Sequence, residues 1–218
     1  MSAESGIPTF RDAGGLWEGH DVMDVASPQG WAKNRELVLD FYNKRRQNVR
    51  EAQPNSAHIA LAQLQDKFEM NIITQNVDDL HERAGSKKVL HLHGEINKSR
   101  STGDPDLIYD VKESGIHIGD KCERGYQLRP HIVWFGEEVP EMVDAMDITS
   151  QANILLVIGS SLGVYPAASL LSYARSTIPV YYIDPNVPDY KFEPNMVHIQ
   201  EKATVGMEIF IKEFLNSR

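Results

Sequence analysis

The sequence has almost no cysteine, no long apolar run and no excess of positive charge. Its 218 residues include one cysteine, Cys122, which excludes an intrachain disulfide and any metal site made only of cysteines from one chain. No apolar run approaches the roughly 20 residues of a membrane span. Residues 1–6 lack the basic and apolar segments of a signal peptide. We therefore expect a cytoplasmic protein with no membrane partner.

The charge balance argues against nucleic acid as a partner. The formal net charge is −9, whereas a protein that binds a nucleic-acid backbone needs clustered positive charge. For the one short basic cluster, residues 44–46, the simplest expectation is a solvated helix face. The length suits one substantial domain and a small inserted one. The sequence does not indicate an oligomeric state.

Apolar residues alternate between helical and strand periods along the chain. Residues 33–52 repeat apolar side chains on one helical face, and a second helix is expected to begin near Pro54. The all-apolar segment 154–158 is typical of a strand buried on both faces of a parallel sheet, and a helix opened by Pro166 follows it. The other expected strands are 71–74, 89–92, 132–135 and 180–183. This alternation predicts an α/β fold with a doubly wound parallel sheet.

Residues 97–128 differ from the rest of the chain. They are polar, contain four glycines and show no firm periodicity. We expect a small module that departs from the main domain, and a long irregular loop is the alternative.

Polar residues follow the strand at 154–158. In doubly wound sheets, ligands bind beyond the carboxyl ends of the strands, where Gly159, Ser160 and Ser161 lie. Glycine lets a phosphate or ribose approach the backbone, and the two hydroxyls can bond it. Asp184 ends the next strand, near the spacing of about 20 residues at which dinucleotide folds place a ribose-binding carboxylate. Ordinary turn chemistry is the alternative for these residues.

Two further strand ends carry groups suited to chemistry. Gln75, Asn76 and Asp78 could clamp a ribose and an amide, although helix capping can account for one of them. His93 could act as a general base near neutral pH, but His91 points the same way in a strand, so periodicity alone does not choose between them.

Together these segments resemble a known family. Six motifs occur in the order in which sirtuins carry them, and the likeness runs from residue 2 to residue 214. The chain is most similar to the short bacterial sirtuins. The motifs are GIPTFR (6–11), TQNVDDLH (74–81), HLHGE (91–95), VWFGE (133–137), GSSL (159–162) and VYPA (164–167).

The resemblance implies a Rossmann-like domain beside a smaller one, with NAD and an acyl-lysine peptide or protein meeting in the cleft between them. NAD is then a co-substrate, and His93 is the general base. By the same resemblance, Val133, Phe135 and Gly136 pair with the substrate backbone by strand addition. The residues implied to bind NAD are Phe10, Arg11, Gln75, Asn76, Asp78, Gly159, Ser160, Ser161, Asp184 and Ala203.

The implied activity is NAD-dependent removal of acyl groups from lysine, with release of nicotinamide and 2′-O-acyl-ADP-ribose. Tyr42 and Arg45 share one helix face and resemble the Tyr-x-x-Arg of desuccinylating sirtuins. We therefore expect succinyl and malonyl groups as substrates beside acetyl. The alternative is that Tyr42 packs in the core and Arg45 is solvated.

Two departures from the family bear on this reading. Sirtuins usually hold zinc through four cysteines in the small domain, and Cys122 alone lies in the matching stretch, so we expect a module without zinc. The apolar first strand and the Gly-Ala-Gly loop that precede this point in sirtuins are absent before Ser2. We expect the first strand of the sheet to be missing and Met1 to be internal to a longer chain.

Two other functions stay open at this point. One is an NAD-binding protein with impaired turnover. In sirtuins the loop glycines let the backbone approach the pyrophosphate closely, and these glycines are missing here. The other is an ordinary Rossmann dehydrogenase, which would need a Gly-x-Gly-x-x-Gly after a strand. We find no such motif in the sequence.

Overall fold

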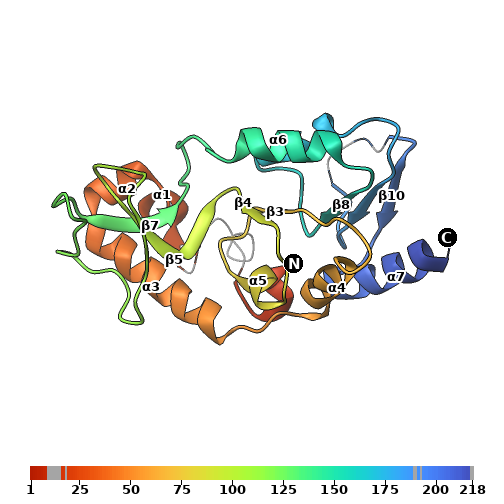
Figure 1. Cartoon of the computed structure of the whole chain (residues 1–218). Coiled ribbons are helices and arrows are strands. Elements are labelled where there is room, and N and C mark those ends of the chain that lie inside the picture. The colour runs from red at the N-terminus through yellow and green to blue at the C-terminus, as the bar shows by residue number, and fades with distance from the viewer. Residues whose placement is uncertain (9–15, 18, 189–190, 192, 217–218) are drawn as a thin grey trace.

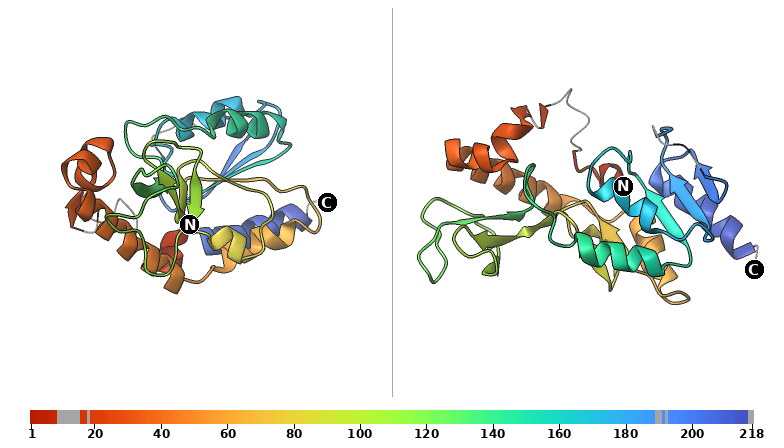
Figure 2. Two further views of the ribbon diagram at one scale, coloured as in Figure 1. Left: turned by 60° about the vertical axis from the view of Figure 1, so that its left-hand side comes forward. Right: turned by 90° about the horizontal axis from the view of Figure 1, so that it is seen from above.

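The computed structural model describes residues 1–8, 16–17, 19–188, 191 and 193–216. The chain forms an elongated molecule with two lobes (Figure 1). One lobe carries parallel strands between helices, and the other carries a small antiparallel sheet beside three helices. Figure 2 shows the same separation from two further directions.

The parallel strands form two sheets. The first contains β8 (Leu155–Ile158), β9 (Val180–Ile183) and β10 (Met196–Ile199) in the order β10-β9-β8. The second pairs β3 (Ile72–Thr74) with β4 (Val89–His91). The expected parallel α/β class is confirmed, but its strands lie in two sheets where the sequence suggested one.

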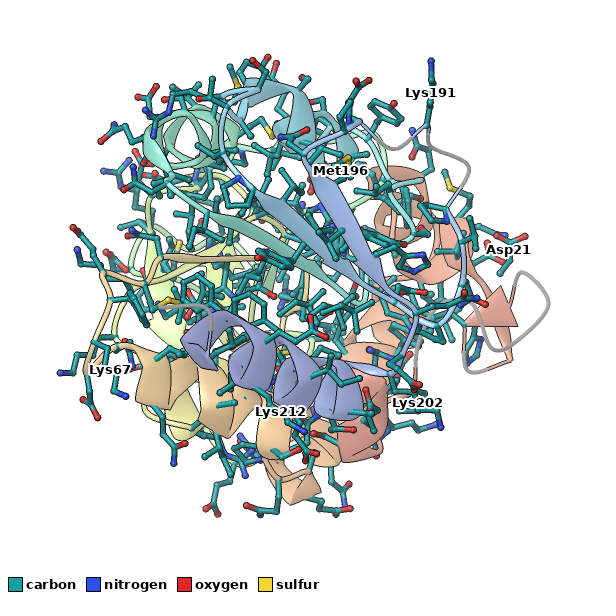
Figure 3. All side chains as sticks on the ribbon, turned by 90° about the vertical axis from the view of Figure 1, so that its right-hand side faces the viewer. Asp21, Lys67, Lys191, Met196, Lys202 and Lys212 are labelled. Carbon is teal, nitrogen blue, oxygen red and sulfur yellow. The ribbon has the colours of Figure 1, made fainter. Side chains whose placement is uncertain are left out.

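Helices cover both faces of the three-stranded sheet. Seen from the end that carries Met196, α7 with Lys212 lies below the strands and helical turns lie above them (Figure 3). This is the doubly wound arrangement. α4 (Ser56–Leu64) and α7 (Ala203–Asn216) share a buried cluster with β9 and β10, and α6 (Met142–Gln151) and the 3-10 helix η2 (Ala167–Tyr173) share another with residues of β3 and β4.

Close packing fixes α7 on the sheet. A side-chain carbon at Gly206 would lie 2.2 Å from Ile183 Cγ2, so only glycine lets the helix approach β9 this closely. Met207 and Phe210 from α7 are buried in the same cluster as Ile183 and Ile199. Each such buried side chain contributes roughly 1.5–3 kcal/mol to folding.

The second lobe is built on α3 (Arg35–Glu51). Its Asn34 cap accepts a hydrogen bond from the amide of Leu37 at 3.0 Å. The apolar face of the helix packs into a cluster that includes residues of the antiparallel sheet. The neighbouring elements are β1 (Leu16–Trp17), β2 (His20–Asp21), α1 (Val22–Val25) and α2 (Pro28–Lys33).

The antiparallel sheet has the order β6-β5-β7. Its strands are β5 (Gly94–Ser101), β6 (Ile108–Asp110) and β7 (Leu128–Ile132). Residues 97–128 are therefore not one irregular loop, because they contain β6 and most of β5. The domain boundary assigned to them stays a prediction.

Two local predictions need correction. The strand expected at 132–135 ends at Ile132, because the amides of the following residues bond other parts of the chain, as described below. The helix after Pro166 is a 3-10 helix rather than an α-helix. By contrast, the helix expected at 33–52 is confirmed with ends shifted by one or two residues.

A deep cleft separates the two parallel sheets. Its volume is about 1040 Å³, and both β3 and β8 contribute to its lining. Within the described residues, β3 pairs only with β4, and β8 pairs only with β9. Each strand therefore turns an unpaired edge away from its partner. None of the helices described in the structure is long and apolar enough to cross a membrane.

Candidate active site

The amino-terminal turn lies where several strands end. The 3-10 helix η1 (Ser2–Ser5) follows Met1, whose amine lies beside Gly159 at the end of β8. Thr204 at the start of α7 donates its hydroxyl to Glu4 Oε2 at 2.6 Å. Burial lowers the pKa of the Met1 amine despite the nearby carboxylates. Residues 1–5 thus contact the end of β8, the start of α7 and, through Ser2, the segment that follows β3.

Asn76 and Asp78 converge on Ser2. Asn76 Nδ2 donates to the Ser2 hydroxyl oxygen at 2.8 Å, and the Asp78 carboxylate also bonds that hydroxyl. Asp78 accepts a second bond from the Leu80 amide at 3.2 Å, at the start of the short helix α5 (Leu80–Arg83), whose N-cap residue is Asp79. Burial raises the pKa of Asp78. Asp78 therefore bonds the turn that leads into α5 without being its N-cap residue.

The two histidines of β4 and its end have different partners. His91 Nδ1 lies 3.2 Å from the Asn76 carbonyl and Nε2 lies 2.7 Å from Glu82 Oε1, so both ring nitrogens donate. The Glu82 carboxylate outweighs the effect of burial and raises the pKa of His91. Both ring nitrogens of His91 are therefore engaged with acceptors, which leaves neither free to accept a proton.

His93 has the arrangement that a general base needs. Its Nδ1 lies 3.1 Å from the carbonyl oxygen of Gln75, which can only accept, so Nδ1 carries the proton. Nε2 is then the acceptor. Burial lowers the pKa of His93, so the ring is neutral near neutral pH. Gln75 thus sets the tautomer of His93 through its backbone.

The Gly159 loop has the geometry of a close backbone approach. Gly159 has φ +63°, and a side-chain carbon there would lie 2.5 Å from the Met1 nitrogen. The Ser160 hydroxyl oxygen accepts from the Leu162 amide, and that of Ser161 accepts from the Gly163 amide, each at 3.2 Å. Neither hydroxyl donates its own proton to another residue that the structure describes.

Asp184 and Ala203 lie on the same side as this loop. Asp184 Oδ1 accepts from the amide and side chain of Asn186 at 2.8 and 3.2 Å, so the carboxylate supports a turn, as the alternative reading expected. Its second oxygen has no hydrogen bond to a described residue. Ala203 is buried at the first position of α7. Phe10 and Arg11 lie outside the described residues.

Tyr42 and Arg45 lie side by side in the second lobe. Tyr42 is 1% exposed, and its oxygen accepts from Trp134 Nε1 at 3.1 Å. Arg45 is 6% exposed, and its guanidinium lies 4.3 Å from the centre of the Trp17 ring. The core packing of Tyr42 agrees with the alternative reading, but Arg45 is buried and not solvated.

The segment after β7 crosses between the lobes with its amides engaged. The Val133 amide donates to the His93 carbonyl and the Phe135 amide to the Ala26 carbonyl, both at 3.0 Å. Phe135 is exposed, and Gly136 has φ +89°. A peptide that pairs here therefore has to donate to carbonyl oxygens of this segment, because two of its amides are occupied.

The sequence reasoning missed three residues that organise these groups. Ser2 joins Asn76 to Asp78, Trp134 bonds Tyr42, and Glu137 binds two arginines beneath Trp134. Ser2 could have been found from its place before GIPTFR. The partners of Trp134 and Glu137 are distant in sequence, so no local pattern shows them.

Comparison with known proteins places these features in a family. The model of the Sir2 family matches residues 1–166. An NAD-dependent protein deacylase of Helicobacter pylori strain J99 is 55% identical over 208 residues, which cover 95% of this chain and 88% of that protein.

Two solved structures are similar over nearly the whole chain. A Sir2 homologue in complex with NAD has a TM-score of 0.88 and 38% identity, and the match covers 99% of this chain and 86% of that one. A Sir2 protein bound to acetylated peptide has a TM-score of 0.80 and 26% identity, covering 98% and 89%.

Proposed function

The chain belongs to the Sir2 family, and from this premise we propose that it removes succinyl and malonyl as well as acetyl groups from lysine side chains. The protein is an NAD-dependent protein deacylase with NAD as co-substrate. Its substrates are acyl-lysine peptides or proteins. The range of acyl groups is the part proposed here, together with the roles of individual residues.

The observation that carries the acyl range is the buried Tyr42–Arg45 pair. The two side chains are one helical turn apart and face the same cluster of aromatic residues. A guanidinium in such surroundings binds a carboxylate strongly, because two parallel N–H groups match its oxygens and little water competes. Tyr42 adds a hydroxyl donor. An acetyl group makes neither contact, so this pair favours acidic acyl groups.

We further propose that His93 is the general base. Neutral Nε2 would take a proton from the ribose hydroxyls of the NAD-derived part of the substrate complex, while the Gln75 carbonyl holds the ring in place. NAD supplies the carbon that receives the acyl oxygen when nicotinamide leaves. Exclusion of water at that step protects the reacting groups from hydrolysis.

The residues at the strand ends suit an NAD molecule. The hydroxyl groups of Ser160 and Ser161 and the close-approach position of Gly159 are appropriate for a ribose or phosphate. Asn76 and Gln75 are appropriate for the nicotinamide ribose and amide. We propose that Asp78, Asp184, Ala203, Phe10 and Arg11 complete this site.

The acyl range is tested with the Arg45→Met variant on one peptide carrying either succinyl- or acetyl-lysine. We expect the succinyl to acetyl ratio of kcat/KM to fall at least about tenfold, since a hydrogen bond to a charged group is worth about 1.5–3 kcal/mol. Lys44→Met is the matched control, because it removes the same charge from an exposed neighbour. Equal losses on both peptides in Arg45→Met would refute the proposal.

The rival reading, NAD binding with impaired turnover, is separated by two measurements on the same preparation. Isothermal titration reports NAD binding, and release of nicotinamide in the presence of acyl peptide reports turnover. Binding without release would favour the rival.

We also propose that residues 97–128 form the small module of the domain and that the protein acts in the cytoplasm.

A further inference from the structure

The hydrogen bond between Trp134 and Tyr42 determines what the Tyr42 hydroxyl can do. An indole N–H only donates, so the 3.1 Å contact makes the Tyr42 oxygen an acceptor. Its own proton must then point elsewhere. No acceptor for that proton is found among the described residues. Burial raises the pKa of Tyr42, so the hydroxyl keeps the proton and stays a donor.

Trp134 is itself held by charged groups. The Arg129 guanidinium lies 3.3 Å from the centre of its ring, and Glu137 accepts from the Trp134 amide at 2.8 Å. Arg129 bonds both carboxylate oxygens of Glu137 at 2.6 and 3.0 Å, and Arg100 bonds it at 3.2 Å. Trp134 is 2% exposed. Its indole N–H therefore has one fixed direction, towards Tyr42.

The position of Trp134 in the chain joins two parts of the site. Its neighbours Val133 and Phe135 belong to the segment proposed to pair with the substrate peptide. The Trp134 side chain is buried in the aromatic cluster that holds Tyr42, whereas Phe135 is exposed. The same short segment can thus meet the peptide backbone on one side and set the acyl-binding hydroxyl on the other.

We propose that Trp134 is a positioning residue for acidic acyl groups, because its indole N–H holds the Tyr42 oxygen and directs the phenolic proton to the carboxylate of the bound acyl chain. This inference rests on the proposed role of Tyr42 and Arg45. Trp134 contacts no substrate atom in this scheme. Its effect passes wholly through the Tyr42 hydroxyl, and that makes it measurable by a double-mutant cycle.

The cycle compares the unaltered protein, Tyr42→Phe, Trp134→Phe and the double variant on the succinyl and acetyl forms of one peptide. We expect Tyr42→Phe to lower the succinyl to acetyl ratio of kcat/KM about tenfold. Trp134→Phe should lower it roughly three- to tenfold, mainly through a higher KM for the succinyl peptide. The double variant should match Tyr42→Phe alone, because no hydroxyl is left to position.

A second substitution guards against a packing defect. Phenylalanine is smaller than tryptophan, so Trp134→Phe could loosen the core. Site-specific replacement of Trp134 by benzothienylalanine keeps the bicyclic shape and removes only the N–H donor. We expect it to reproduce the lower ratio, and an unchanged ratio in this variant would overturn the inference.

The outcomes separate this inference from the function on which it rests. If Tyr42→Phe and Arg45→Met both leave the ratio unchanged, the proposed acyl range fails, and the role of Trp134 fails with it. If those two variants are selective but Trp134→Phe is not, the role of Trp134 alone is wrong. The role of Trp134 would also be contradicted if Trp134→Phe lowered kcat/KM equally on both peptides. The same holds if the effects of Tyr42→Phe and Trp134→Phe on the ratio added in the double variant.

Discussion

At the scale of single residues, two histidines that lie two positions apart have pKa values shifted in opposite directions. His91 is held between a carbonyl and the Glu82 carboxylate, which raises its pKa. His93 bonds only a carbonyl through Nδ1, and burial lowers its pKa. A base must be neutral with a nitrogen that can accept, and His93 alone of the two meets this requirement.

His93→Ala is therefore expected to abolish deacylation, with at least about a 100-fold loss in kcat, while the protein still folds. The measurement is nicotinamide release, with circular dichroism to check the fold. His91→Ala is the matched control and should keep turnover, although loss of its bond to Glu82 will lower the melting temperature. A dead His91→Ala beside an active His93→Ala would reverse the assignment.

At the scale of elements, α4 and α5 meet through two buried histidines. The rings of His58 and His81 lie 4.9 Å apart, and His58 also accepts from the Asn55 amide at the start of α4. Burial lowers the pKa of His58 to about 3 and that of His81 to about 4. Both rings are neutral in the folded protein and titrate near 6.5 when unfolded.

This pair makes stability depend on pH. Because the folded pKa values lie below 6.5, the unfolded chain binds more protons than the folded chain as the pH falls. The contribution of these histidines to the free energy of unfolding is therefore complete above pH 6.5 and is lost from there towards pH 4. The loss is about 1.4 kcal/mol per pH unit for each histidine. The free energy of unfolding in urea, measured at pH 7 and 5, should show a smaller difference for His81→Phe. An identical difference would mean that His81 does not contribute.

The β6-β5-β7 sheet contacts the one cysteine of the chain, Cys122. Cys122 is buried and its thiol donates to the Ser101 hydroxyl at 3.2 Å, while Glu123 is taken by Tyr109. Within the described residues no three His, Cys, Asp or Glu side chains gather as metal ligands would. The sheet is held by backbone pairing and by the ion pairs of Glu137.

We accordingly predict less than about 0.1 zinc per chain, because one thiolate cannot build a four-cysteine site. Elemental analysis of protein purified without chelator measures this directly. Incubation with EDTA should leave the melting temperature unchanged. One tightly held zinc per chain, or a fall in melting temperature after chelation, would refute the prediction.

At the scale of the whole molecule, a cleft of about 1040 Å³ lies between the two parallel sheets. Its walls include Ile72 and Ile73 from β3 and Leu156 and Val157 from β8, and Met1 lines it as well. Among the described residues, β3 pairs only with β4 and β8 only with β9, so both strands have an unpaired edge. A parallel strand placed there would join the two sheets into one.

We predict that an engineered extension of about ten residues before Met1, an apolar strand followed by Gly-Ala-Gly, raises the melting temperature and tightens NAD binding. Five buried apolar residues at roughly 1.5–3 kcal/mol each compare with about 5–15 kcal/mol for a whole domain. A Gly-Ser extension of equal length is the control. If the apolar and the Gly-Ser versions melt and bind NAD alike, the cleft does not accept a strand.

The sequence alone determined the family, the parallel α/β class and most helices and strands, because these depend on local periodicity and on short motifs. It also placed Tyr42 and Arg45 on one helix face, since three residues span nearly one helical turn. Periodicity could not choose between His91 and His93, which would share one face of a strand, so the choice of His93 rested on the family resemblance.

Tertiary structure decided what depends on contacts between distant segments. Glu82 bonds His91 and raises its pKa, and Trp134, 92 residues after Tyr42, donates to the Tyr42 hydroxyl oxygen. The same holds for Asp184, because only the structure shows that one of its carboxylate oxygens bonds Asn186 in a turn. Hydrogen-bond partners and burial fix protonation and orientation, and neither is encoded by spacing along the chain.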